Sequence, residues 1–218
     1  MYEAIIFDLD GTLIDSERVS FEEFQKMCAA FGKEYTTAQH KILMGRSGEV
    51  NNRTIREQFG VPVTDDQMKV VRQDIRSRLI REGESILKPG VREFLQSLSL
   101  AGYRLGIATA SSPTYREAIL TSTGILALFE GFVSGEEVAM PKPAPDIYLA
   151  VAKKFGVNPM RCLAVEDGIA GIESGRTAGM DILGIRDRFF FDDLPGVKRI
   201  IDSFEEITVD DVVAMSVA

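Results

Sequence analysis

Two aspartates near the N-terminus have the residue type and the spacing that metal-assisted chemistry requires. Asp8 and Asp10 follow a short apolar run, residues 4–7, and precede Gly11 and Thr12. Two carboxylates at the end of a buried strand repel each other and are costly to bury unless a cation lies between them. Mg2+ is a hard cation that takes oxygen ligands and can bridge a carboxylate and a phosphate. The pair therefore favours a magnesium site, although Asp, Gly and Thr are also ordinary turn residues.

Three later clusters carry other groups that such a site needs. They are Thr109-Ala110-Ser111, Lys142 within residues 140–146, and Glu166-Asp167-Gly168. Each follows an expected strand or a junction between a strand and a helix. Taken alone, each could be an ordinary loop or the cap of a helix. Their common placement favours one shared site.

These groups together fit the transfer of a phosphoryl group. Asp8 can attack phosphorus and hold an aspartyl-phosphate intermediate, provided that a cation screens the repulsion between carboxylate and phosphate. The side chains of Asp8 and Asp167 would bind Mg2+ together with the backbone carbonyl of Asp10. The free carboxyl of Asp10 would protonate the leaving alkoxide and later deprotonate the attacking water.

The remaining groups would hold the phosphoryl oxygens or support the metal. Lys142 would act as a point charge, and Thr109 would contribute its hydroxyl. The backbone N–H groups of Gly11 and Ala110 could complete the cradle. Glu166 is predicted to fix the metal or a water from outside the shell of direct ligands.

Alternating strands and helices predict a sheet that would bring the clusters together. Apolar runs of strand type occur at residues 4–7, 104–108, 131–133, 162–165, 182–185 and 198–201. Segments of helical length separate most of them, which is typical of a doubly wound parallel sheet covered on both faces. Reacting groups then lie outside the carboxyl ends of the strands. We therefore predict an α/β fold with a Rossmann-like core.

One long connection, residues 16–85, interrupts this alternation. Apolar side chains recur at helical spacing in residues 24–31 and 68–79. Capping-box spacing predicts that helices start at Thr36 and Thr64. The segment is too long for an ordinary crossover. We predict a helical cap, residues 16–85, inserted into a core of residues 1–15 and 86–218.

Composition limits the partners. The chain has 33 acidic and 25 basic residues, and its net charge of −8 argues against nucleic acid or an anionic membrane as the main partner. Cys28 and Cys162 lack the spacing of a metal site and are predicted to be reduced core thiols. No signal segment or apolar run of about 18 residues, the length that spans a membrane, is found, so we expect a cytoplasmic location. We also expect a monomer.

Two further features receive structural interpretations. His40 is the only histidine, and it has no acidic or nucleophilic partner nearby in sequence, so we place it at the surface. The three phenylalanines at 189–191 could form an exposed patch, but packing under a late loop is favoured.

The four clusters, in this order, resemble the haloacid dehalogenase superfamily. The similarity is to members with a small helical cap after the first strand, the group that contains β-phosphoglucomutase and phosphoglycolate-type phosphatases. It rests on residues 7–16, 89–91, 108–112, 142–148 and 165–179. The resemblance implies Mg2+, an aspartyl-phosphate intermediate, and a cap that opens and closes about hinges near residues 13–17 and 87–90.

Departures from the mutase pattern favour hydrolysis. Ser20 stands where the mutase has a histidine, and Gly48 aligns with the arginine that grips its second phosphate, while Arg46 lies two residues earlier. A mutase must hold a second phosphate while the first is transferred. We therefore expect a Mg2+-dependent phosphomonoester hydrolase for a small phosphorylated metabolite of the sugar phosphate type. Cap residues Ser20, Arg46 and Arg53 are candidates to contact the substrate.

Other functions stay open. A β-phosphoglucomutase-like mutase would convert one sugar phosphate into another. A signalling receiver also has an aspartate nucleophile, acidic metal ligands, a threonine and a lysine, but it is shorter and its acidic pair comes early. A dehalogenase needs neither Mg2+ nor Asp10. A non-catalytic phosphate-binding module would release no inorganic phosphate.

Overall fold

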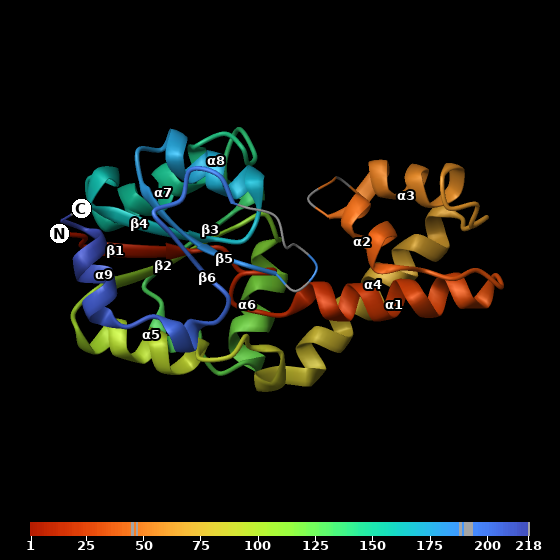
Figure 1. Cartoon of the computed structure of the whole chain (residues 1–218), viewed down its shortest axis with the longest axis horizontal. Helices are drawn as coiled ribbons and strands as arrows, with labels where there is room; N and C mark the ends of the chain where they lie inside the picture. The colour runs from red at the N-terminus through yellow and green to blue at the C-terminus, as the bar shows by residue number, and fades with distance from the viewer. Residues whose placement is uncertain (45, 47, 188, 190–193, 218) are drawn as a thin grey trace.

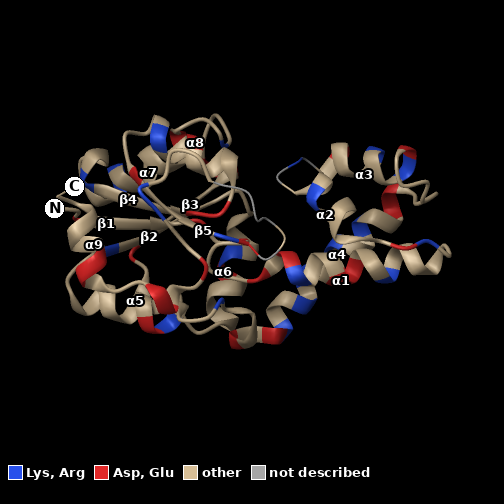
Figure 2. Cartoon of the chain, viewed as in Figure 1, with Lys and Arg blue, Asp and Glu red and all other residues tan. Residues whose placement is uncertain are grey.

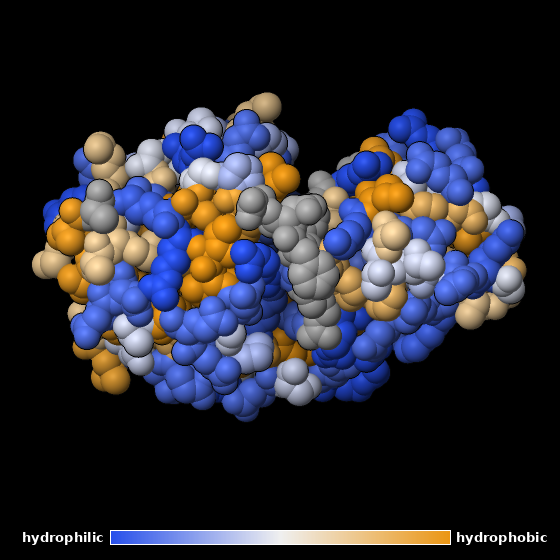
Figure 3. Space-filling view, viewed as in Figure 1, coloured by the Kyte–Doolittle hydropathy of each residue, from blue (hydrophilic) through white to orange (hydrophobic). Residues whose placement is uncertain are grey.

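The molecule consists of a core built on a sheet and a helical unit that projects from one side of it (Figure 1). The computed structural model describes residues 1–44, 46, 48–187, 189 and 194–217. Both termini lie at the end of the core that is far from the helical unit. The space-filling view shows an indentation between the two units (Figure 3).

Within the described residues, the core contains one sheet of six parallel strands. They are β1 (Ala4–Phe7), β2 (Arg104–Thr109), β3 (Gly131–Ser134), β4 (Cys162–Glu166), β5 (Asp181–Ile185) and β6 (Arg199–Ile201). Their order is β3-β2-β1-β4-β5-β6, which places β1 between β2 and β4. All the expected strands are confirmed, and their ends differ from the expected ranges by one residue at most.

Helices cover both faces of this sheet. One face packs against α5 (Val91–Leu100), α6 (Pro113–Ser122) and α9 (Val209–Met215), and the other against α7 (Asp146–Phe155) and α8 (Ile169–Thr177). Side chains of β1 alternate between the faces, with Ile5 and Phe7 in the first core and Ala4 and Ile6 in the second. The prediction of an α/β fold with a Rossmann-like core is confirmed.

Short 3-10 helices complete the connections. They are η1 (Gly83–Ile86), η2 (Leu126–Leu128), η3 (Gly135–Glu137), η4 (Pro159–Arg161) and η5 (Phe204–Glu206). Among the described helices, none is both long and apolar enough to cross a membrane. Cys28 and Cys162 are free and buried, as predicted.

The helical unit has a core of its own. It comprises α1 (Ser16–Ala30), α2 (Thr37–Leu43), α3 (Gly48–Glu57) and α4 (Asp65–Glu82). Capping boxes start α2 at Thr36 and α4 at Thr64, which confirms both predicted helix starts. The apolar side chains of this core are Phe24, Met27, Cys28, Tyr35, Leu43, Ile55, Val61, Val63 and Met68. Both signs of charge occur along α1 and α4 (Figure 2), where Arg78 pairs with Glu22 and Glu23.

The two chain segments that join the units lie side by side. Ile14 and Leu87 form an antiparallel bridge. The Asp15 N–H donates to the Ile86 carbonyl at 2.8 Å, and the Lys88 N–H donates to the Leu13 carbonyl at 3.0 Å. These are the segments expected to act as hinges. The hinge role and the domain limits at residues 15/16 and 85/86 stay predictions.

His40 is buried, so the prediction that it lies at the surface is wrong. Its side chain is 2% exposed, with Nε2 at 2.9 Å from Glu17 Oε2 and Nδ1 at 3.0 Å from the Tyr35 hydroxyl. Glu17 belongs to α1 and is far from His40 in sequence, so proximity along the chain could not reveal the pair. Phe189 is also buried and packs against Phe21 and His40, whereas residues 190 and 191 lie outside the described residues.

Candidate active site

The register of the sheet gathers the predicted catalytic residues at one edge. Phe7 of β1 is paired with Ile107 of β2 and with Val165 of β4. The Asp8 N–H also donates to the Val165 carbonyl at 3.0 Å. The residues that follow these pairs therefore emerge together at the carboxyl ends of the strands, where ligands bind in open α/β sheets.

Lys142 lies between two buried carboxylates. Its Nζ is 2.6 Å from both Asp8 Oδ1 and Glu166 Oε1, and it donates to the Ala108 carbonyl at 3.0 Å. Burial alone would lower the pKa of Lys142, but the charges of Asp8 and Glu166 outweigh it and raise that pKa above its ordinary value. The ammonium therefore stays protonated and faces the group that would attack phosphorus.

Negative charge at this edge exceeds what Lys142 can balance, although the charge of Lys88 also lowers the pKa of Asp167. Burial raises the pKa of Asp8 well above its ordinary value; Lys142 opposes this rise, and the charges of Glu166 and Asp167 add to it. Burial, followed by the charge of Glu166, raises the pKa of Asp167 to about 7. Such shifts mark carboxylates that would gain from a further cation.

The acidic residues fit a magnesium ion. Carboxylate oxygens of Asp8, Glu166 and Asp167 lie within 4.8 Å of one another, and oxygen donors of this kind suit Mg2+. Thr12 Oγ1 donates to Asp167 Oδ1 at 2.8 Å and fixes that carboxyl. Gly11 has a φ of +81°, and a Cβ there would overlap the Asp167 carboxyl, so glycine keeps the space open.

Several contacts fix the side chain of Glu166. The Tyr148 hydroxyl donates to Glu166 Oε1 at 2.7 Å, and the Asp167 N–H donates to Oε2 at 3.1 Å. A Cβ at Gly171 would overlap the Glu166 carboxyl. The structure therefore places Glu166 inside the acidic cluster, close enough to serve either as a ligand or as a partner of Lys142.

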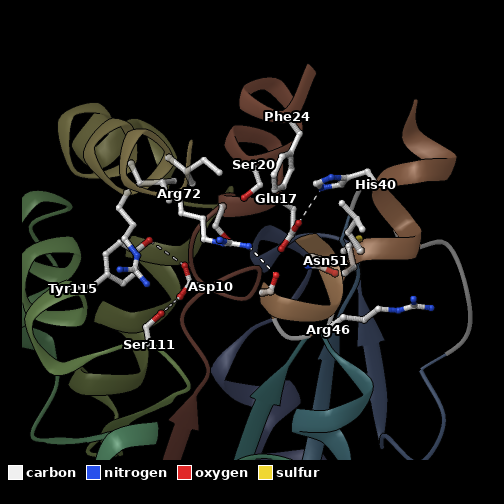
Figure 4. A pocket seen from close by; sticks show the side chains of 17 residues that line it. Asp10, Glu17, Ser20, Phe24, His40, Arg46, Asn51, Arg72, Ser111 and Tyr115 are labelled. Carbon is white, nitrogen blue, oxygen red and sulfur yellow. Dashed lines mark hydrogen bonds and ion pairs between the residues drawn. The ribbon is translucent and has the colours of Figure 1, made fainter. Parts of the chain in front are cut away.

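The carboxyl of Asp10 accepts hydrogen bonds from two hydroxyl groups. Ser111 Oγ donates to Asp10 Oδ2 at 2.7 Å and the Tyr115 hydroxyl donates to Oδ1 at 3.1 Å (Figure 4). Burial raises the pKa of Asp10, and these two hydrogen bonds oppose the rise. Among the described residues, the acidic cluster that could hold a metal does not include this carboxyl. The arrangement suits a group that exchanges protons more than a metal ligand.

The predicted phosphate cradle is partly engaged in internal hydrogen bonds. Thr109 is buried at the end of β2, and its Oγ1 accepts from the Ser111 N–H at 3.1 Å. Ala110, the next residue, is exposed. The Gly11 N–H donates to the Ile14 carbonyl at 3.0 Å, so it would have to give up this bond to hold a phosphoryl oxygen.

A cavity of about 310 Å3, here called the cap cavity, lies between the helical unit and the core. Its lining includes Asp10, Glu17, Ser20, His40, Arg46, Gly48, Asn51, Arg72, Arg76, Ser111 and Tyr115. Of the three predicted substrate residues, Ser20 and Arg46 therefore line it. The Arg46 side chain extends away from the other labelled side chains (Figure 4). Arg53 is exposed on α3 and is not part of the lining.

Comparison with known proteins identifies the family of this chain. A sequence model described as haloacid dehalogenase-like hydrolase matches residues 2–179. The chain belongs to the haloacid dehalogenase-like hydrolase family. It is similar to protein CbbY of Rhodobacter capsulatus, with 33% identity over 190 residues that cover 83% of this chain and 84% of CbbY.

Two other family members are also similar over most of their length. A phosphorylated carbohydrates phosphatase of Thermotoga maritima is 31% identical over 189 residues, which are 82% of each chain. The crystal structure of CbbY from Rhodobacter sphaeroides in complex with phosphate superposes with a TM-score of 0.76 at 28% identity, covering 94% of this chain and 96% of that one. The protein is thus an enzyme, a phosphatase of the haloacid dehalogenase-like family.

Several residues around the family site escape sequence reasoning. Glu17, Arg72, Arg76 and Tyr115 line the cap cavity, but no cluster at a strand end contains them. One signal was available for the arginines, because positions 72 and 76 are one helical turn apart and share a face of α4. Nothing in the local pattern of α6 distinguishes Tyr115 from a core aromatic residue.

Proposed function

We propose that this phosphatase is a Mg2+-dependent phosphomonoester hydrolase that acts through an aspartyl-phosphate intermediate. The observation that carries the proposal is the position of Asp8, at the end of β1, 2.6 Å from the Lys142 ammonium and in one acidic cluster with Asp167. A carboxylate placed between a fixed cation and a potential metal site can approach a phosphate dianion without prohibitive repulsion.

In the proposed first step, an Asp8 carboxylate oxygen attacks phosphorus, and the bond from phosphorus to the leaving oxygen breaks. Asp10 gives its proton to the leaving alkoxide. In the second step, Asp10 takes a proton from water, which attacks the aspartyl-phosphate and releases inorganic phosphate. Lys142 and the Thr109 hydroxyl hold the phosphoryl oxygens during both steps.

Mg2+ would neutralise charge on the phosphate, held by the side chains of Asp8 and Asp167 and by the backbone carbonyl of Asp10. Glu166 would support it from beside Lys142. Gly11 and Ala110 would contribute backbone N–H groups once Gly11 releases the Ile14 carbonyl.

The substrate is proposed to be a small phosphorylated metabolite of the sugar phosphate type. The cap cavity combines carboxylate, hydroxyl and guanidinium groups, including Glu17, Ser20 and Arg76, and such a mixture suits hydroxyl groups and a second polar end. The related phosphatase of Thermotoga maritima, named for phosphorylated carbohydrates, supports this class. A cytoplasmic location and a monomeric state remain part of the proposal.

Hydrolysis is favoured over the mutase alternative because Ser20 and Gly48 stand where the mutase has a histidine and an arginine. A Cβ at this position would lie 3.1 Å from Arg72 Nη2, and Arg72 Nη2 donates to the Gly48 carbonyl at 2.9 Å. The Arg72 guanidinium thus lies beside the backbone of Gly48. Formation of glucose 6-phosphate from β-glucose 1-phosphate with a bisphosphate primer would contradict this choice.

The test is to replace Asp8 by Asn. Asp8→Asn keeps the size of the side chain but removes the nucleophile, so turnover of p-nitrophenyl phosphate and of a panel of phosphorylated sugars should fall by several orders of magnitude. The matched control is Asp202→Asn, which removes an exposed carboxylate 2.6 Å from Arg186 and should leave turnover unchanged. Full activity of Asp8→Asn, or release of phosphate that EDTA does not reduce, would refute the proposal.

A further inference from the structure

Tyr115 lies where the proposed acid-base group, the cap cavity and the helical unit meet. Its hydroxyl donates to Asp10 Oδ1 at 3.1 Å, and Tyr115 lines the cap cavity (Figure 4). The Arg76 guanidinium carbon lies over its ring, 5.6 Å from the centroid. Arg76 belongs to α4 of the helical unit, and Tyr115 belongs to α6 of the core. One side chain therefore contacts both Asp10 and the cap.

The surroundings of Tyr115 hold its hydroxyl in place. Tyr115 sits in the first turn of α6, where its N–H donates to the Oγ of the N-cap residue Ser112 at 3.4 Å. Tyr115 as a whole residue is 8% exposed and belongs to the larger apolar core. A ring fixed by packing has little freedom to follow Asp10 if that carboxyl turns.

The two hydroxyl donors grip opposite oxygens of one carboxyl. Ser111 holds Oδ2 and Tyr115 holds Oδ1 of Asp10. With a single donor, the carboxyl could pivot about that bond, but two donors from separate positions define its orientation. Ser111 follows β2 in the core. Tyr115 is the donor whose ring the cap contacts.

We propose that Tyr115 is a positioning residue for Asp10, and that Arg76 links this positioning to the cap through the tyrosine ring. The inference rests on the proposed function, in which Asp10 protonates the leaving alkoxide. The packed core limits the movement of the ring, and Arg76 adds a contact from the cap that helps to keep the hydroxyl on Asp10. When the cap moves away, the ring loses that added contact. The orientation of Asp10 then depends on whether the cap is in place.

The leaving group provides a readout that a structural role would not affect. An alkoxide is a poor leaving group and needs a proton, whereas p-nitrophenolate leaves without one. The ratio kcat/KM reports the steps up to departure of the leaving group. Tyr115→Phe keeps the ring and its contact with Arg76 but removes the donor to Asp10. The variant should lower kcat/KM for an alkyl phosphate by about 10-fold or more relative to the wild-type enzyme. Its kcat/KM for p-nitrophenyl phosphate should stay within about 2-fold of the wild-type value.

Tyr2→Phe is the matched control. The Tyr2 hydroxyl is also a buried donor to an aspartate, Asp181, at 2.7 Å, but it lies near the termini and away from the site. The kcat/KM values of this variant should equal those of the wild-type enzyme with both substrates. The fall in its thermal unfolding midpoint measures how much stability is lost when a buried hydroxyl donor of this kind is removed. A comparable midpoint for Tyr115→Phe would separate positioning from folding.

A double-mutant cycle tests the part assigned to Arg76. Arg76→Met should reduce kcat/KM for the alkyl phosphate in the wild-type background but add nothing in the Tyr115→Phe background, because the route to Asp10 is already cut. Additive losses would mean that Arg76 acts on the substrate, or on Asp10 through its own charge, without the tyrosine, and would overturn its role.

Failure of this inference is distinguishable from failure of the proposed function. A wild-type enzyme that releases no phosphate with Mg2+ would defeat the proposed function itself. An active wild-type enzyme in which Tyr115→Phe slows both substrates equally, or neither, would overturn only the positioning role.

Discussion

Replacing Lys142 by Met removes the ammonium that lies between two buried carboxylates. Lys142 Nζ is 2.6 Å from Asp8 Oδ1 and from Glu166 Oε1, and the lysine side chain is 10% exposed. Met keeps an unbranched stem of similar length, so the change removes charge and little packing. The expected effect is a loss of stability in the metal-free protein that grows with pH.

The magnitude follows from the two unpaired carboxylates. Removing one member of a buried ion pair costs about 3–5 kcal/mol, because the remaining charge stays buried without a partner. A carboxyl group can escape this cost by binding a proton. Burial already raises the pKa of Asp8, and the charge of Lys142 opposes that rise. Removing Lys142 would therefore raise the pKa of Asp8 further.

The sign of the pH dependence follows from the raised pKa. Between the unfolded pKa of Asp, about 3.9, and its higher native value, the native state binds more protons than the unfolded state. Stability contributed by this group therefore falls as pH rises through that window, by up to about 1.4 kcal/mol per pH unit for each proton. Because the pKa of Asp8 is already raised in the wild-type protein, the difference between variant and wild type comes only from the further rise that the loss of Lys142 causes.

The assay is urea unfolding in EDTA at pH 5 and pH 8, followed by circular dichroism. Lys142→Met should lose about 3–5 kcal/mol of unfolding free energy relative to wild type at pH 8 and much less at pH 5. Lys69→Met is the control, because it removes an ammonium 2.9 Å from Asp66 on the exposed face of α4, and it should change nothing measurable at either pH. Equal losses for Lys142→Met at both pH values would refute the electrostatic reasoning.

Three other outcomes are expected. Thr12→Val removes the donor to Asp167 Oδ1 at 2.8 Å and should lower the unfolding free energy by about 1–3 kcal/mol in urea titrations; an unchanged value would show that this carboxyl does not depend on the bond. Because the pKa of Asp167 is raised to about 7, protons compete with Mg2+, and its affinity in calorimetric titration should fall below pH 7; a flat profile from pH 8 to pH 5.5 would contradict this. Burial raises the pKa of Cys162 to about 11 and also raises that of Cys28. Ellman's reagent at pH 8 should therefore modify neither thiol before urea is added. Rapid modification of the folded protein would contradict this prediction.

The core of the fold was predictable because buried parallel strands are continuous apolar runs. Residues 162–165, for example, are apolar, and β4 spans Cys162–Glu166 with every residue buried. Polar clusters that follow such runs must meet at one edge of the sheet. The convergence of Asp8 with Asp167 follows from this rule. The position of Lys142 does not, because it depends on the path of a loop, and no local pattern encodes that path.

The surroundings of the cap were not predictable in the same way. His40 was assigned to the surface because its partner Glu17 is distant in sequence, yet the two lie 2.9 Å apart. Arg53 is a candidate substrate residue by sequence, but it is exposed on α3 and does not line the cap cavity. Helical periodicity tells which face of a helix is apolar. It does not tell which polar side chains meet a neighbouring helix.

These two kinds of residue divide the proposed chemistry between the two units. Asp8, Lys142 and Asp167 all lie in the core, and their contacts are with one another and with other core residues. Asp10 is different, because Tyr115 connects it to Arg76 on the cap, and the charge of Glu17 on α1 also contributes to its raised pKa. If the proposed roles hold, a change in the cap would alter proton transfer to the leaving group and the fit of the substrate, while the residues proposed to bind the phosphoryl oxygens would stay in place. This division explains why the motifs of the core identify the family and leave the substrate to residues that only the packing of the cap reveals.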